Sequence, residues 1–142
     1  MDTPMGREHD KQVAREYFDA FIRGDRDWWQ RNVRPDFRRH DPGLPYEVVG
    51  IEGLQHHHDV LLAGVPDLNL PIHDVMEDDG KVLVRLRFRG THTGEFLGHA
   101  PTGGAIDVEV FDLFRLEGGQ LVEHWAMVDS LSLLKQLGAT SI

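Results

Sequence analysis

Apolar residues recur at helical spacing in three stretches of the chain. From Glu8 to Arg23 they fall three and four positions apart on one stripe, made of Val13, Ala14, Tyr17, Phe18, Phe21 and Ile22. The segment 50–62 repeats this spacing, and a last helix is expected over 130–137, ending at Gly138. Asp25 and Asp129 stand where they can cap a short second helix and the last helix. The pattern therefore predicts helices mainly in the first half.

The second half alternates between apolar and polar residues, which is typical of strands. In "KVLVRLRFRGTH" (81–92) the apolar positions share one face and three arginines share the other. Residues 105–129 predict two strands joined by a hairpin at Glu117-Gly118-Gly119-Gln120. The segment 34–50 contains three prolines, which favours a loop with extended parts. Helices followed by a curved antiparallel sheet predict a single α+β domain in which the helices cover one face of the sheet.

The strand around Asp112 is apolar on both of its faces. Phe111 and Leu113 lie on the face opposite Asp112 and Phe114. A sheet that meets water on its outer side would carry polar residues there. We therefore expect the outer face to pack against a second copy of the chain, giving a homodimer.

Length and charge narrow the class of protein. The 142 residues fit one domain, with frayed ends expected at 1–7 and 139–142, and the net charge of −9 disfavours nucleic acid as a partner. There is no cysteine, which excludes disulfides and thiolate chemistry. No apolar run is long enough to span a membrane, and the polar N-terminus lacks a signal sequence, so we expect a cytoplasmic protein.

Nine histidines raise the question of a metal site. His56, His57 and His58 are consecutive on a predicted helix, so their side chains diverge and cannot all bind one ion. Neither an HExxH motif nor any pair of histidines at i, i+4 is present. We expect neither a metal nor a cofactor.

Three sequence motifs resemble those of a known family. "GTHTGEFLGHAPTGG" (90–104), the "EHW" of the last strand and the terminal "LLKQLG" are similar to the SnoaL-like polyketide cyclases, within the nuclear-transport-factor-like superfamily. The resemblance implies a cone-shaped fold, a deep apolar pocket between helices and sheet, and cofactor-free acid/base chemistry on a carbonyl compound. It also implies a catalytic aspartate at the position of Ala126, and an alanine methyl group cannot accept a proton.

A second resemblance points to the ketosteroid isomerase branch of that superfamily. Tyr17 stands seven residues before Gly24-Asp25, Asp41 precedes a proline, and Asp112 begins "DLFR". These three residues match the functional positions of that branch. The match implies that Asp41 is the general base and that Tyr17 and a protonated Asp112 hold the developing oxyanion. In such an arrangement an apolar site keeps the carboxylic acid neutral, so that it can donate a hydrogen bond.

The residues themselves allow both functional and structural roles. Asp112 belongs to the core face, where burial should raise its pKa above about 3.9, unless it bonds to backbone or to His124. His124 should point inward as a proton shuttle or as a buried neutral histidine. Asp41 can serve as a base or form an Asx-turn, and Tyr17 can be a donor or a core aromatic. Further candidates for substrate contact are His40, Phe21, Trp29, His58, Phe88, Phe114, Ala126 and Val128.

The sequence thus predicts a cofactor-independent enzyme that acts on a hydrophobic carbonyl compound, with a polyketide cyclase-like reaction favoured. An isomerase, a dehydratase or an epoxide-opening cyclase is the alternative reaction, because Ala126 replaces the aspartate that the first resemblance implies. A binding protein without catalysis is the alternative class.

Overall fold

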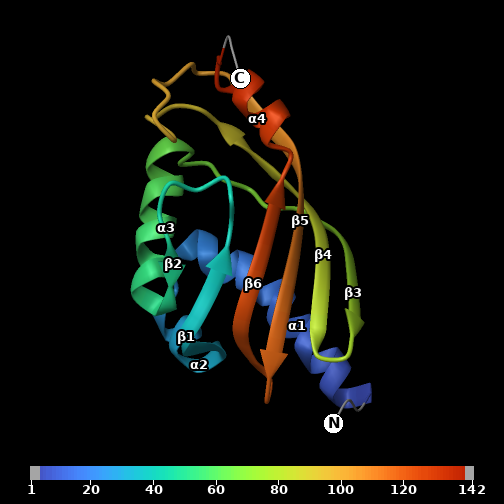
Figure 1. Cartoon of the computed structure of the whole chain (residues 1–142). Helices are drawn as coiled ribbons and strands as arrows, with labels where there is room; N and C mark the ends of the chain where they lie inside the picture. The colour runs from blue at the N-terminus through green and yellow to red at the C-terminus, as the bar shows by residue number, and fades with distance from the viewer. Residues whose placement is uncertain (1–3, 140–142) are drawn as a thin grey trace.

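The chain folds into a mixed six-stranded sheet that curves around helices on one side. The structure, a computed structural model, describes residues 4–139 (Figure 1). The elements in chain order are α1 (Pro4–Arg23), α2 (Arg26–Asn32), β1 (Val33–His40), β2 (Val48–Val49), α3 (Gly50–Gly64), β3 (Ile72–Asp78), β4 (Lys81–Thr91), β5 (Ala105–Glu117), β6 (Gln120–Val128) and α4 (Ser130–Gln136). The strand order across the sheet is β2-β1-β6-β5-β4-β3. This confirms the predicted α+β class, with α1 and α3 packed on the inner face (Figure 1).

The predicted helices are present, and both predicted caps are formed. The Asp25 side chain accepts a hydrogen bond from the N–H of Trp28 at the start of α2. Asp129 does the same for Ser132 at the start of α4. Of the ends expected to be frayed, residues 4–7 belong to helix α1, which begins at Pro4, and residues 1–3 and 140–142 lie outside the described part of the chain.

Segment 33–40 is a strand, where the sequence predicted mostly loop. Strand β1 pairs in parallel with β6 and in antiparallel fashion with the two-residue β2, so the sheet is mixed and not purely antiparallel. Pro35 cannot donate a ladder hydrogen bond, and the pairing with β6 shifts register between Val33 and Arg38, around the proline. The strand therefore accommodates a residue that normally indicates a loop.

The β5–β6 hairpin forms as predicted. Its two connecting residues, Gly118 and Gly119, have φ values of 57° and 78°. Positive φ at both central positions matches a tight turn whose twist fits the flanking strands. Beyond the turn the register shifts between Arg115 and Leu116, and after this shift Asp112 lies opposite Ala126 and Phe114 opposite His124.

The core lies between the inner sheet face and the helices. Val82, Val84 and Leu86 of β4 are buried on this face, as are Val110 and Phe114 of β5. On the outer face, the three arginines of β4 that the sequence placed together form ion pairs with carboxylates. They are Arg85, Arg87 and Arg89. Within residues 4–139, no helix has the length and apolar character needed to cross a bilayer.

Candidate active site

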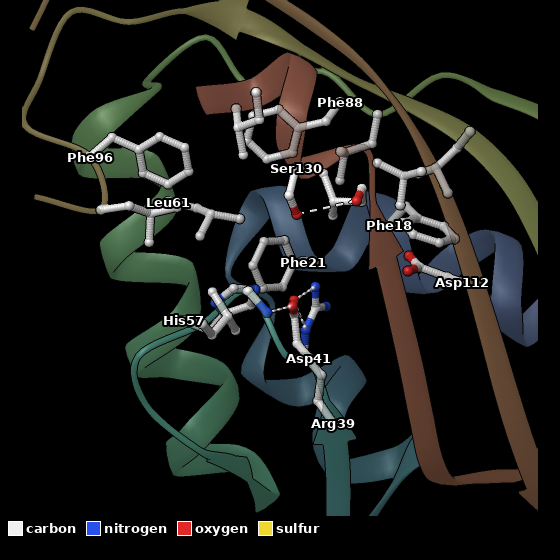
Figure 2. Close-up of a pocket in the computed structure, with 18 of the residues that line it drawn as sticks. Phe18, Phe21, Arg39, Asp41, His57, Leu61, Phe88, Phe96, Asp112 and Ser130 are labelled. Carbon is white, nitrogen blue, oxygen red and sulfur yellow. Dashed lines mark hydrogen bonds and ion pairs between the residues drawn. The ribbon is translucent and has the colours of Figure 1, made fainter. Parts of the chain in front are cut away.

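A largely apolar cavity opens between α1, α3 and the inner face of the sheet. The space between its walls, counted with the solvent in its open mouth, is about 750 Å³. Its lining residues are Tyr17, Phe18, Phe21, Arg39, Asp41, Gly43, Leu44, His57, Leu61, Leu70, Leu86, Phe88, Phe96, Leu97, Val110, Asp112, Val128, Ser130 and Leu133. Figure 2 shows that the charged side chains gather in one region below the ring of phenylalanines and aliphatic residues.

An ion pair between Arg39 and Asp41 occupies the centre of this polar region. Arg39 follows Phe37 on the inner side of β1, and Asp41 is the first residue after the strand. The Asp41 Oδ2 accepts hydrogen bonds from Arg39 Nη2 at 2.9 Å and Nε at 3.3 Å, and its Oδ1 accepts one from the N–H of Gly43 at 3.0 Å (Figure 2). The two side chains are 11% and 9% exposed. This is a buried pair that holds both members in place.

Arg39 also interacts with two further groups of the cavity. Burial acts to lower the pKa of the guanidinium, but the Tyr17 hydroxyl, the Asp112 carboxyl and Asp41 together raise it above its ordinary value. Arg39 therefore stays a cation in an apolar setting. Burial raises the pKa of Tyr17 to about 12, so this residue keeps its hydroxyl proton. That hydroxyl is buried without a well-formed hydrogen bond, even though Arg39 lies close enough to act on its pKa.

Asp112 lies on β5 with His124 beside it on β6. Asp112 lines the cavity and is 3% exposed. The His124 Nε2 lies 3.3 Å from Asp112 Oδ1, but the contact lacks the angles of a hydrogen bond. Burial lowers the pKa of His124, against the opposing effect of Asp112, and its ring stacks on Phe114 at 4.2 Å between centroids. His124 is thus a neutral imidazole that lies next to the Asp112 carboxyl.

The wall formed by α3 contributes a second buried histidine. His57 lines the cavity and is fully enclosed, and its Nδ1 lies 2.8 Å from the Tyr46 hydroxyl. Burial, with smaller effects of Arg39 and His124, lowers the pKa of His57 well below 6.5. His57 is therefore a neutral imidazole in the pocket wall.

The structure brings together only part of the predicted site. Tyr17, Asp41 and Asp112 line one cavity, and the predicted contact residues Phe21, Phe88 and Val128 line it as well. His124, Trp29, Phe114 and Ala126 are buried beside the cavity but do not line it.

Two predicted contact residues lie elsewhere and need correction. His40 is on the outer face, where it bonds Glu123 at 2.6 Å and stacks on Trp125, because residues 39 and 40 of a strand point to opposite faces. The Nδ1 of His58 bonds the carbonyl of Phe21, away from the cavity.

The sequence did not single out three polar residues of the cavity lining, which are Arg39, His57 and Ser130. A strand over 33–40 would have placed Arg39 on the same face as Phe37, but the prolines favoured a loop. Residues three and four positions apart lie on one face of a helix, and this spacing relates His57 to Leu54 and Leu61. The apolar stripe of α3 therefore indicates that His57, and not His58, lies on the inward face. Among residues 4–139, no cluster of three or more His, Asp or Glu side chains is arranged to hold a metal ion.

Comparison with known proteins identifies the family. The profile of the SnoaL-like polyketide cyclases matches residues 11–137. The chain belongs to the SnoaL-like polyketide cyclase family. No curated protein matches the sequence.

Solved structures of other SnoaL-like proteins have the same fold. A protein of Jannaschia sp. CCS1 that is named after the family superposes with a TM-score of 0.84 at 28% identity, covering 100% of this chain and 99% of the other. TsrD from Streptomyces laurentii gives 0.81 at 29% identity over 94% and 97% of the two chains. IdmH from Streptomyces antibioticus, provisionally named a polyketide cyclase, gives 0.76 at 28% identity over 91% and 98%.

Proposed function

We propose that this SnoaL-like protein is a cofactor-independent enzyme that removes a proton next to the carbonyl group of a hydrophobic small molecule and promotes ring closure. The observation that supports the proposal is the position of Arg39, Tyr17 and Asp112 in one region of a largely apolar cavity. An apolar compartment with a few convergent polar groups and an opening for the ligand is the usual form of such a site.

Arg39 and Tyr17 are suited to hold the oxygen of the developing enolate. Arg39 stays charged, and Asp41 fixes its orientation through two hydrogen bonds. The Tyr17 hydroxyl keeps its proton and has no well-formed bond to a protein acceptor that would compete with the substrate. Preorganised donors of this kind stabilise charge as it forms, because they need not reorient during the reaction.

We assign proton abstraction to Asp112. The sequence suggested Asp41 for this role, but in this fold both oxygens of Asp41 already accept hydrogen bonds from Arg39 and Gly43. Among the described residues no hydrogen bond to the Asp112 carboxyl is recorded; His124 Nε2 lies 3.3 Å from it, and the carboxyl borders the cavity. In the proposed step the Asp112 carboxylate takes the proton from the carbon, and the electron pair moves onto the carbonyl oxygen beside Arg39.

Isotope exchange tests this step without knowledge of the natural substrate. The probe is 2-tetralone, a bicyclic ketone with exchangeable protons next to its carbonyl, followed by NMR in D₂O. Wild-type protein should accelerate exchange above the buffer rate, and Asp112→Asn should lower the rate about 10²–10⁴-fold. The matched control is Asp74→Asn on the outer face, which should not change it.

The outcomes separate the alternatives. Binding of 2-tetralone without accelerated exchange would contradict an enzyme and favour a binding protein. A larger loss for Asp41→Asn than for Asp112→Asn would return the base to Asp41, as the ketosteroid isomerase resemblance implies. In that case Tyr17 and Asp112 would be the oxyanion donors, and isomerisation of a β,γ-unsaturated ketone would be the better reaction.

We further propose that the protein forms a homodimer through its outer sheet face. Met76, Leu83, Leu113 and Trp125 make one apolar row across β3, β4, β5 and β6. Phe111 and Met127 extend it, and both are exposed. The residues on either side of this apolar row include both acidic and basic side chains. A second copy of the chain, related by two-fold symmetry, can therefore place opposite charges against each other. A contiguous apolar area of this kind is typical of an interface.

A further inference from the structure

His57 presents a hydrogen-bond donor to the cavity from the wall opposite Asp112. Its ring packs against Phe21 and lies on the other side of the Arg39–Asp41 pair from Asp112 in the view of Figure 2. The Tyr46 hydroxyl oxygen lies 2.8 Å from Nδ1 of His57, with which it forms a hydrogen bond. The structure records no bond to Nε2 among the described residues, so that nitrogen is the part of the ring available to a bound molecule.

The contact with Tyr46 determines which ring nitrogen holds the proton. Burial raises the pKa of Tyr46 to about 12, so its hydroxyl keeps the proton and can donate it. The neutral imidazole has one acceptor nitrogen, and a phenol is a better donor than acceptor. Nδ1 therefore accepts from Tyr46, and the single ring proton lies on Nε2, toward the cavity. A neutral imidazole can polarise a carbonyl, as it does in triosephosphate isomerase.

We propose that His57 is a further catalytic residue of the enzyme, which donates from Nε2 to the electrophilic carbonyl oxygen during ring closure, and that Tyr46 is its positioning residue. The idea rests on the proposed function, because the enolate formed at Asp112 is the attacking group. The new bond joins the enolate carbon to the second carbonyl carbon, whose C=O π electrons move onto oxygen. That oxygen takes the Nε2 proton, Nδ1 takes the proton of Tyr46, and water restores the Tyr46 proton. Asp112 then releases the proton that it abstracted, which neutralises the hydroxide left by that water.

Tyr46 is placed to connect the cavity with solvent. It is half-buried, and it also lines a shallow surface hollow with Arg38, Pro45 and Glu47. Tyr46 thus lines the surface hollow while its hydroxyl bonds the enclosed His57. Because Nδ1 of His57 is bonded to this hydroxyl, the proton that Nδ1 takes up comes from Tyr46.

The tautomer of His57 gives a test that needs no substrate. Nitrogen-15 NMR at about pH 7 should show a neutral ring protonated on Nε2, with the signal assigned through its loss in His57→Phe. Tyr46→Phe should give a mixture of tautomers in an otherwise unchanged spectrum. A ring protonated on Nδ1 in the wild type would overturn the proposal.

Ring closure gives the second test. The probe is 2-methyl-2-(3-oxobutyl)cyclohexane-1,3-dione, which has a ketone to form the enolate and others to receive it. His57→Phe should slow its closure about 10-fold or more, and Tyr46→Phe should slow it by a smaller factor. In both variants closure should be slowed by a larger factor than the exchange of 2-tetralone, because the exchange step depends on Asp112, Arg39 and Tyr17 and has no second carbonyl group to receive the Nε2 proton. The control is His56→Phe, an exposed neighbour that contacts Tyr46 and does not line the cavity.

The two assays separate the failure of this proposal from that of the proposed function. Wild-type exchange with unimpaired closure in His57→Phe would remove His57 from the mechanism and leave the function intact. Absence of exchange in the wild type would remove both. Loss of exchange in His57→Phe, with the fold retained, would mean that the residue shapes the cavity and does not donate to the second carbonyl.

Discussion

The buried ion pair of Arg39 and Asp41 predicts a large coupling energy. The side chains are 11% and 9% exposed, and their closest contact is 2.9 Å. Removing one member of such a pair leaves a charge without compensation and costs about 3–5 kcal/mol. We expect Arg39→Met and Asp41→Asn each to destabilise by this amount. The double variant leaves neither member of the pair charged, so it should cost about the same as one single change. The coupling, which is the sum of the two single effects minus the effect of the double variant, is then about 3–5 kcal/mol.

Urea unfolding of the four proteins, followed by circular dichroism, measures this coupling. The control is the pair formed by Arg38 and Glu47, which lies on the same strand and its following loop at 3.2 Å but with side chains 47% and 80% exposed. Solvent screening should limit its coupling to about 0–1 kcal/mol. A value for Arg39 and Asp41 no larger than that of the control would refute the view that the cavity holds a dry, structurally required ion pair.

The same variants connect stability with the proposed chemistry. The double variant should be folded, but it lacks the cation that holds the enolate oxygen. Its exchange rate with 2-tetralone should therefore fall about 10²–10³-fold, the usual loss when one oxyanion donor is removed. A folded double variant that retains the wild-type rate would exclude Arg39 from catalysis.

Three further measurements address other parts of the structure. Burial lowers the pKa of His57 and His124 below 6.5, so the unfolded chain binds more protons. The contribution of the two neutral histidines to the free energy of unfolding should be complete above about pH 6.5. Below that pH it should be lost at about 1.4 kcal/mol per pH unit for each histidine. In urea titrations His57→Phe should halve this slope, and an unchanged slope would contradict a buried neutral His57. Met127→Arg, at a side chain 64% exposed on the outer face, should convert a dimer into a monomer in sedimentation experiments, and a monomeric wild type would exclude the interface. Gly64→Ala would place a Cβ 2.7 Å from the Cβ of Phe96, so it should cost about 1–3 kcal/mol and weaken 2-tetralone binding; unchanged affinity would separate the Phe96 loop from the site.

Local signals in the sequence were sufficient for most of the fold. The apolar stripe of α1 and the capping aspartates act within one or two turns of helix, and paired glycines define a tight hairpin by their own conformation. Strand β1 was missed because its pairing with β6 joins segments more than 80 residues apart, and because Pro35 and four charged residues conceal its period. The fold is thus predictable where its determinants are close together in the chain.

The candidate site was predictable to the extent that its residues occupy clear strand or helix faces. Asp112 and Tyr17 belong to regular apolar patterns, and both line the cavity. Arg39 was not predicted as a site residue, because the strand β1 that orients its side chain was not predicted. His57 was passed over because three consecutive histidines look alike until the helix is phased by Leu54 and Leu61. The missing information was therefore the orientation of side chains, and not the identity of the chemical groups.

The pairing of Asp112 with Ala126 shows why a second carboxylate at position 126, which the family resemblance implied, would be unfavourable in this chain. The two residues are Cα partners on neighbouring strands and both point inward, so their Cβ atoms are about 4.5–5.5 Å apart. Carboxylates at both positions would be like charges in a dry wall, and one would have to keep a proton. The methyl group of Ala126 removes that conflict, and it leaves Asp112 with the neutral ring of His124 as its neighbour. We infer that one carboxylate is sufficient on this wall, and that on β5 it faces the cavity shared with Arg39 and Tyr17, whereas Ala126 does not line it.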